Sequence, residues 1–183
     1  MAAAVAGEDV GKTGNPVVVM ETSLGTVKLE LWPDKAPATV KNFLRYAEEK
    51  FYDGTIFHRV IANFMIQGGG LTPNLERKPT RAPIKNEART ELKNLRGTIA
   101  MARTSDVDSA TSQFFISVKD NPFLDHRSDL PEEFGYAVFG KVIEGMDVVD
   151  KIRSVETTTR SGYKDVPVTP VVIRSVRLAA PAK

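Results

Sequence analysis

The stretch FHRVIANFMIQGGG, residues 57–70, is the most informative part of this sequence. One arginine, Arg59, and one glutamine, Gln67, stand among large apolar residues, and a run of glycines follows. Because side chains alternate along a strand, Phe57, Arg59 and Ile61 are predicted to share one face. The pattern indicates a binding surface on which an arginine lies across an apolar pocket.

The segment that precedes this stretch predicts a hairpin and a helix. Val17–Thr22 and 26–31 are rich in Val and Leu, and turn residues join them. Beyond Pro37, apolar residues recur at the spacing of a helix. The residues that form this predicted apolar stripe are Val40, Phe43, Leu44 and Ala47.

The segments that follow the glycine run are short apolar stretches, which predict further strands. Residues 144–155 place apolar side chains on one face and predict a second helix. Many short strands with only two helices favour an all-β barrel or sandwich, and spacing alone does not choose between them. The remaining predicted strands are 56–61, 64–67, 97–102, 113–118, 136–142 and 171–178.

The composition is that of one globular domain. The 183 residues include 25 Lys and Arg against 23 Asp and Glu, interspersed along the chain, so no nucleic-acid-binding patch is expected. Cysteine is absent, which excludes disulfides and thiolate catalysis. We predict a disordered tail at 1–16, one domain at 17–178 and a C-terminal tail at 179–183. No apolar stripe beyond the core pattern calls for a partner, so a monomer is expected.

The N-terminus has neither a basic segment nor the apolar run of a secretory signal. No apolar stretch approaches the roughly 20 residues that cross a bilayer, so no membrane association is expected. These features favour a cytoplasmic protein. A periplasmic location is the alternative, if the N-terminus is a processed or replaced signal.

The 57–70 stretch resembles the signature of the cyclophilins, the peptidyl-prolyl cis/trans isomerases, and most resembles their bacterial single-domain members. The resemblance extends over residues 17–178 and implies a closed eight-stranded antiparallel barrel with a helix over each open end. It also implies catalysis without a cofactor or metal, on Xaa-Pro bonds of unfolded or flexible polypeptides. Only before proline is the cis peptide appreciably populated, and a barrier of about 18 to 20 kcal/mol slows its exchange.

Arg59 occupies the position of the family's catalytic arginine, which by resemblance hydrogen-bonds to the prolyl nitrogen and stabilises the twisted transition state. The wall of the proline pocket is assigned by the same resemblance to Phe64, Met65, Phe115 and Leu124. Phe64 and Met65 would point to opposite faces of a regular strand. We therefore predict that the strand begins or bulges near Asn63.

Two glutamines and one backbone segment complete the predicted site. By resemblance, Gln67 orients the arginine and touches substrate, and Gln113 lies along the groove. The backbone of Ala102 and Arg103 is expected to pair with the residue before proline, as in β-augmentation.

Several residues depart from the eukaryotic pattern of the family. Phe123 stands where many members have a tryptophan, so an indole N–H that donates to cyclosporin is missing and only weak cyclosporin binding is expected. Tyr136 replaces a pocket histidine. The 129–134 segment looks inserted relative to short relatives and is expected to border the groove.

Two functions from different classes remain open at this point. The chain is an isomerase, or it is a binding module that holds proline-containing segments in the same groove. Arg59 favours the enzyme, because a passive proline pocket would not need it. The two histidines, His58 and His126, lack partners at metal-ligand spacing, so structural roles are expected for them.

Overall fold

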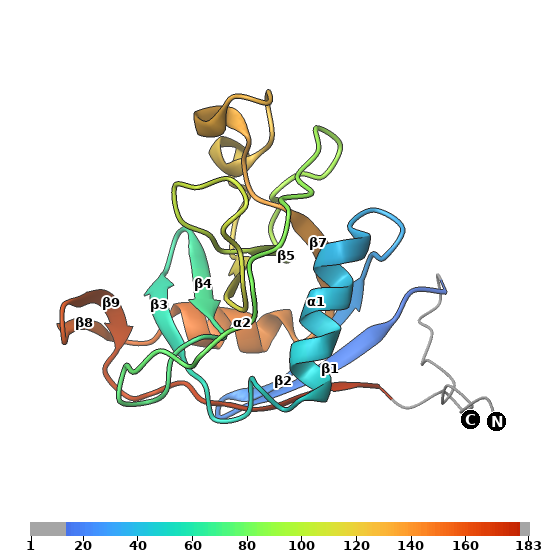
Figure 1. The fold of residues 1–183 in the computed structure, drawn as a ribbon. Helices are drawn as coiled ribbons and strands as arrows, with labels where there is room; N and C mark the ends of the chain where they lie inside the picture. The colour runs from blue at the N-terminus through green and yellow to red at the C-terminus, as the bar shows by residue number, and fades with distance from the viewer. Residues whose placement is uncertain (1–13, 180–183) are drawn as a thin grey trace.

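The computed structural model describes residues 14–179 as a strongly curled antiparallel sheet with two helices (Figure 1). Eight strands follow one another in the order β10-β1-β2-β7-β5-β6-β4-β3. The predicted tails, 1–16 and 179–183, lie outside the described residues except for 14–16 and 179. The strands of this sheet are β1 (Val17–Thr22), β2 (Gly25–Leu31), β3 (Phe57–Ile61), β4 (Met65–Gly68), β5 (Thr98–Met101), β6 (Phe114–Ser117), β7 (Val138–Glu144) and β10 (Ile173–Leu178).

The sheet is an open half-barrel, with β10 and β3 as its two ends. The closed barrel implied by the resemblance is therefore not confirmed, whereas its eight antiparallel strands are. Backbone hydrogen bonds nevertheless link the first residue of each end strand to the segment that precedes the other. The N–H of Phe57 donates to the carbonyl of Val171 at 3.0 Å, and Ile173 donates to Thr55 at 2.8 Å.

The first helix, α1 (Pro37–Glu48), contains the stretch for which the sequence predicts a helix. Proline suits a first helical position because its missing N–H would have no partner there. The helix has no side-chain cap of its own, and the carboxylate of Glu87 accepts from the N–H of Ala38 and of Thr39 instead. The predicted apolar stripe is confirmed, since Val40, Phe43 and Ala47 are buried and Leu44 packs against the core.

The second helix, α2 (Met146–Arg153), is shorter than the predicted 144–155. Gly145 precedes it with φ 96°, a left-handed conformation that favours glycine. A Cβ atom on this glycine would lie 2.4 Å from the carbonyl oxygen of Thr26, so only glycine lets the helix start this close to β2.

Stacked aromatic rings fill the middle of the core. Phe114 on β6 is completely buried, and its ring centroid lies 5.6 Å from Phe43, 5.5 Å from Tyr52 and 6.1 Å from Phe57. All three contacts are edge-on, the geometry that aromatic quadrupoles prefer. The cluster joins α1 to the β3–β4–β6 side of the sheet, which carries the candidate site.

A second, two-stranded sheet was not predicted. It consists of β8 (Thr157–Arg160) and β9 (Tyr163–Pro167), and it lies beside β3 (Figure 1). Ser161 and Gly162 form its turn with φ values of 50° and 79°. A Ser-Gly pair between threonines and a tyrosine is a hairpin signal that the sequence does contain.

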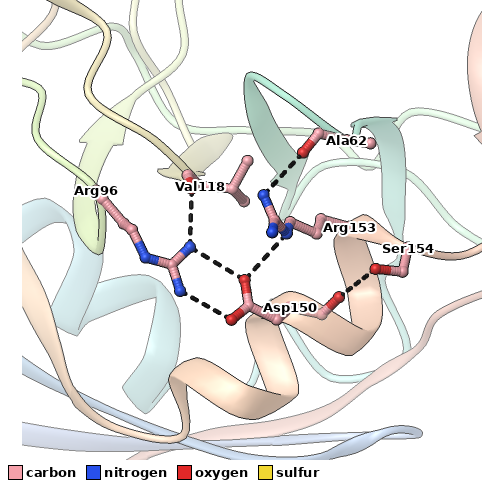
Figure 2. Close-up of polar contacts among 6 residues, drawn as sticks. All are labelled: Ala62, Arg96, Val118, Asp150, Arg153 and Ser154. Atoms are coloured by element: carbon pink, nitrogen blue, oxygen red, sulfur yellow. Dashed lines mark hydrogen bonds and ion pairs between the residues drawn. The ribbon is translucent and has the colours of Figure 1, made fainter.

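An ion-pair network ties α2 to two loops (Figure 2). Arg96 binds both carboxylate oxygens of Asp150, at 3.0 and 2.8 Å, and also donates to the carbonyl of Val118. Arg153 reaches the same carboxylate at 3.0 Å and donates to the carbonyl of Ala62 in the β3–β4 turn. The two arginines hold the pKa of Asp150 below its usual value, first through the Arg96 hydrogen bond. The network therefore attaches the helix to the site-bearing hairpin.

Replacing Arg96 with alanine is expected to lower the free energy of unfolding by about 1 kcal/mol. The bidentate geometry strengthens the Arg96–Asp150 ion pair, but both side chains are partly exposed, which limits the contribution of the pair to stability. Urea unfolding measures the change, with Arg174→Ala as the control because Arg174 is exposed on β10. Equal losses in the two variants would contradict the prediction.

Candidate functional site

The β3–β4 hairpin carries Arg59, and strand β3 is irregular directly before this residue. Phe57 pairs with Gly68 and Arg59 pairs with Gln67, so His58 is an extra residue in a β-bulge. Phe57 consequently lies in the main core, and the exposed Arg59 lies on the other face. The prediction that Phe57 and Arg59 share a face is therefore wrong, because it assumed strict alternation.

The turn between the strands brings two consecutive side chains into one pocket. Strand β4 begins at Met65, directly after a turn closed by the N–H of Phe64 donating to Ile61 at 3.0 Å. Phe64 belongs to the turn and Met65 to the strand, so alternation does not separate them. The predicted irregularity near Asn63 is confirmed.

A pocket of about 110 Å³ opens beside this hairpin, and we call it the Arg59 pocket. Its floor and walls are mainly apolar and aromatic, and no Asp or Glu lines it. Nine of the eleven residues predicted for the site line this pocket. They are Arg59, Phe64, Met65, Gln67, Ala102, Arg103, Phe115, Leu124 and Tyr136.

Two amides hold Arg59 at the mouth of the pocket. Its Nη1 donates to Oε1 of Gln67 at 3.3 Å, and Nε2 of Gln67 donates to Oε1 of Gln113 at 3.0 Å. Gln113 therefore lies behind Gln67. A Cβ atom on Gly70 would lie 2.5 Å from Cγ of Gln113, so the last glycine of the run leaves the space that Gln113 fills.

The charge of Arg59 is not neutralised by any carboxylate of residues 14–179. Its hydrogen bond goes to a neutral amide, and its guanidinium lies 5.9 Å from the centroid of the Phe64 ring. A cation that is positioned but not paired can donate to an uncharged acceptor held against the apolar wall. Among the described residues that line the Arg59 pocket, no nucleophilic side chain contacts a general base.

Arg103 and Tyr136 form the opposite rim. The Arg103 guanidinium lies 4.7 Å from the centroid of the Tyr136 ring and donates to the carbonyls of Gly135 and Thr104. Ala102, which precedes Arg103 and was predicted to belong to the site, donates its N–H to the carbonyl of Gln113 at 3.0 Å. That N–H is already engaged, so pairing with a substrate would use other main-chain groups of the segment.

Phe123, the other predicted residue outside the Arg59 pocket, lies on its border. Its side chain is 65% exposed, and its ring centroid is 5.4 Å from that of Phe64. It lines an adjoining open cavity of about 640 Å³, which we call the Phe123 cavity. Pro131 and Glu132 line the same cavity, so the 129–134 segment does border the groove as predicted.

A third cavity adjoins the Arg59 pocket on its other side. This Arg77 cavity, of about 400 Å³, shares Gln67, Ala102 and Arg103 with the pocket. Its other lining residues, apart from Gln113, were not predicted. They come from the bulge, the loop after β4, the loop after β5 and the missed hairpin: His58, Leu71, Arg77, Thr80, Thr104, Ser109, Thr111 and Tyr163.

Acid is expected to destabilise the protein through His58. Burial, and then repulsion by Arg59 and Arg77, lowers the pKa of His58 to about 4. The unfolded chain, with a pKa of about 6.5, takes up the proton first, so stability is full above pH 6.5 and falls as the pH drops towards 4. Urea unfolding from pH 7 to 4 should show a smaller fall for His58→Gln than for the wild type. Parallel curves would refute this.

Two kinds of feature are absent from residues 14–179. They contain no cluster of three or more His, Asp or Glu that could hold a metal ion. Among the same residues, no helix is long and apolar enough to cross a membrane.

The fold has close counterparts among solved structures. A crystal structure of a cyclophilin type peptidyl-prolyl cis-trans isomerase from Cryptosporidium parvum matches with a TM-score of 0.79 and 27% identity, over 92% of this chain and 99% of that one. Another crystal structure with this description, in the presence of the dipeptide Ala-Pro, matches with a TM-score of 0.77 and 28% identity, over 90% of this chain and 99% of that one.

Sequence comparison gives the same relationship at higher identity. The model of the family described as cyclophilin type peptidyl-prolyl cis-trans isomerase/CLD matches residues 17–178. Peptidyl-prolyl cis-trans isomerase cyp18 of Streptomyces antibioticus is 58% identical over 88% of this chain and 97% of the relative. Peptidyl-prolyl cis-trans isomerase B of Escherichia coli is 52% identical over 89% of this chain and 99% of the relative. A family model that matches residues 17–178, together with relatives that are 58% and 52% identical over nearly their whole length, means that the chain belongs to the cyclophilin-type peptidyl-prolyl cis-trans isomerases.

Proposed function

We propose that the Arg59 pocket binds the proline of an Xaa-Pro segment and that Arg59 catalyses rotation about the preceding peptide bond. The observation that carries this proposal is an unneutralised guanidinium, held by Gln67 at the mouth of a pocket with apolar walls. A proline ring has no donor and suits such walls. The C. parvum protein studied with Ala-Pro supports a proline-containing ligand.

The proposed role of Arg59 follows from the electronic structure of the peptide bond. Conjugation of the nitrogen lone pair with the carbonyl creates the barrier, and twisting the bond returns the lone pair to nitrogen. A guanidinium N–H can donate to that lone pair in the twisted state but not in either planar isomer. This hydrogen bond from the guanidinium therefore lowers the barrier to rotation without strengthening the binding of either planar isomer, as catalysis requires.

No proton, electron or covalent bond needs to be exchanged in this reaction, so we propose that it proceeds without a cofactor. The proposed substrates are exposed Xaa-Pro segments of folding or flexible polypeptides, in which uncatalysed isomerisation takes tens of seconds or longer. The residue before proline is proposed to pair with the Ala102–Arg103 backbone.

Exchange spectroscopy on a short Xaa-Pro peptide tests the function. Cis and trans signals of the peptide should exchange much faster with catalytic amounts of the folded protein than without it. A folded protein that binds the peptide but leaves its exchange rate unchanged would instead be a proline-peptide binding module.

Cyclosporin is expected to bind more weakly than nanomolar, because Phe123 carries no N–H donor at the edge of the pocket. Phe123→Trp would add a donor and should tighten binding by about three- to tenfold, which is the worth of one ordinary hydrogen bond. Calorimetric titration of both proteins measures the difference. Nanomolar binding by the wild type would contradict the expectation.

A further inference from the structure

The Arg77 cavity is placed to receive a substrate side chain that lies close to the proline. Gln67, Ala102 and Arg103 separate it from the Arg59 pocket, since they line both. A chain that extends from one to the other would pass over the Ala102–Arg103 backbone. That backbone is the segment proposed to pair with Xaa.

The spacing of an extended chain selects the residue that enters. In a strand-like peptide, residues i and i+2 point to one face, about 6.5 to 7 Å apart. When the proline ring enters the Arg59 pocket, Xaa points to the opposite face. The residue before Xaa then points to the same face as proline and meets the Arg77 cavity.

The walls of the Arg77 cavity are rich in donors and cationic. Two arginines, Arg77 and Arg103, line it together with several hydroxyl groups, and neither Asp nor Glu does. Arg77 is exposed and has no ion pair within residues 14–179. The Arg103 guanidinium donates to the carbonyl oxygens of Gly135 and Thr104. The positive charge here is therefore local, because the whole chain carries a formal net charge of only +2.

His58 is a second, independent observation that points to a ligand in the Arg77 cavity. Its side chain is buried, yet Nδ1 makes no hydrogen bond to any described residue. Buried polar atoms nearly always have a partner. A ligand side chain in this cavity is one group that could satisfy it.

The opposite end of the groove differs in charge. The Phe123 cavity is lined by two acidic residues, Asp125 and Glu132, as well as by three arginines. Oδ1 of the buried Asp125 already accepts hydrogen bonds from Asn94, so Glu132 is the more available carboxylate. An acidic substrate side chain would meet both acidic and basic residues at that end, whereas in the Arg77 cavity it would meet basic residues without an acidic one. The charge distribution therefore distinguishes the two directions along the bound peptide.

We propose that the Arg77 cavity selects an acidic side chain, so that the protein prefers substrates of the form Glu-Xaa-Pro or Asp-Xaa-Pro. This inference rests on the proposed function of the Arg59 pocket. Arg77 and Arg103 supply the opposite charge, and His58 with the hydroxyl groups of Thr80, Thr111 and Tyr163 supplies further hydrogen bonds. Because Arg77 is exposed, the preference is screened by salt.

Blocked peptides that differ at one position test the proposal. The series acetyl-Ala-Z-Ala-Pro-Phe-amide, with Z as Glu, Gln or Lys, is compared by exchange spectroscopy at low salt. We expect kcat/KM to be about fivefold higher for Glu than for Gln, and lower for Lys. In Arg77→Gln the Glu-to-Gln ratio should fall towards one, and it should persist in Arg174→Gln, which removes the same charge from β10. A fourth peptide, with Gln at Z and Glu directly after proline, should show no gain.

The possible failures are distinguishable. Equal rates for Glu and Gln, a ratio unaffected by Arg77→Gln, or a gain from Glu after proline would overturn the inference and leave the isomerase intact. If the folded protein accelerates none of the peptides, the proposed catalysis fails. Chemical-shift titration with the same peptides then decides the charge preference, since tighter binding of the Glu peptide would support it and equal binding would reject it.

Discussion

Replacing Arg59 with alanine is expected to lower kcat/KM for an Xaa-Pro peptide about 100-fold. The lost interaction is one charge-assisted hydrogen bond, of about 1.5 to 3 kcal/mol, that forms only as the amide twists. Removal of a single donor aimed at a transition state has effects of this size. The loss should appear in kcat, with little change in peptide affinity, because the planar isomers do not use the bond.

The variant should stay folded, which makes the kinetic result interpretable. Arg59 is exposed and bonds only to Gln67 among the described side chains, so truncation leaves no buried group unpaired. Exchange spectroscopy gives the rate, peptide titration gives the affinity, and Arg174→Ala serves as the control. A variant with wild-type turnover would remove Arg59 from the mechanism. Parallel losses of affinity and rate would make it a binding residue only.

Replacing Phe114 with alanine is expected to lower the free energy of unfolding by about 3 to 5 kcal/mol. The ring is fully buried and contacts three other rings, so its loss removes apolar burial and leaves a cavity. Rigid neighbours from α1 and β3 cannot easily close that space. Against a typical total of 5 to 15 kcal/mol, such a loss brings the protein close to unfolding at moderate temperature.

Urea unfolding measures this effect, and Phe123→Ala is the matched control. Both variants remove a phenylalanine, but Phe123 is 65% exposed, and its loss should cost well under 1 kcal/mol. A similar loss for both would mean that the aromatic cluster does not carry the stability assigned to it.

The sequence predicts most of the fold because its elements are locally consistent. The stripe of α1, the 17–31 hairpin and the alternating β strands each follow from residues close in the chain. The α1 cap was not predictable, since Glu87 comes from a distant loop and only tertiary folding brings it to Thr39. The closed barrel came from resemblance alone, and the open strand order does not confirm it.

The site was predicted as far as family positions reach. Arg59 and the pocket walls gather as expected. Sequence patterns do not predict the Arg77 cavity, because it is assembled from loops and from the β8–β9 hairpin, a pair of strands outside the predicted set. Neither the unpaired state of Arg77 nor the burial of His58 can be deduced from periodicity, because both depend on contacts between segments distant in the chain.

The bulge in β3 indicates which part of the protein would change if a related chain lacked this one residue. If His58 were deleted, Phe57 and Arg59 would be consecutive residues of a regular strand, paired with Gly68 and Gln67 as they are now. They would therefore still point to opposite faces, Phe57 into the core and Arg59 to the pocket. The core therefore has no need of this insertion. What the insertion changes is the local twist of the strand and the wall of the neighbouring cavity. Selection for its presence would act on the substrate groove, and a natural chain one residue shorter here could keep the fold while recognising different partners.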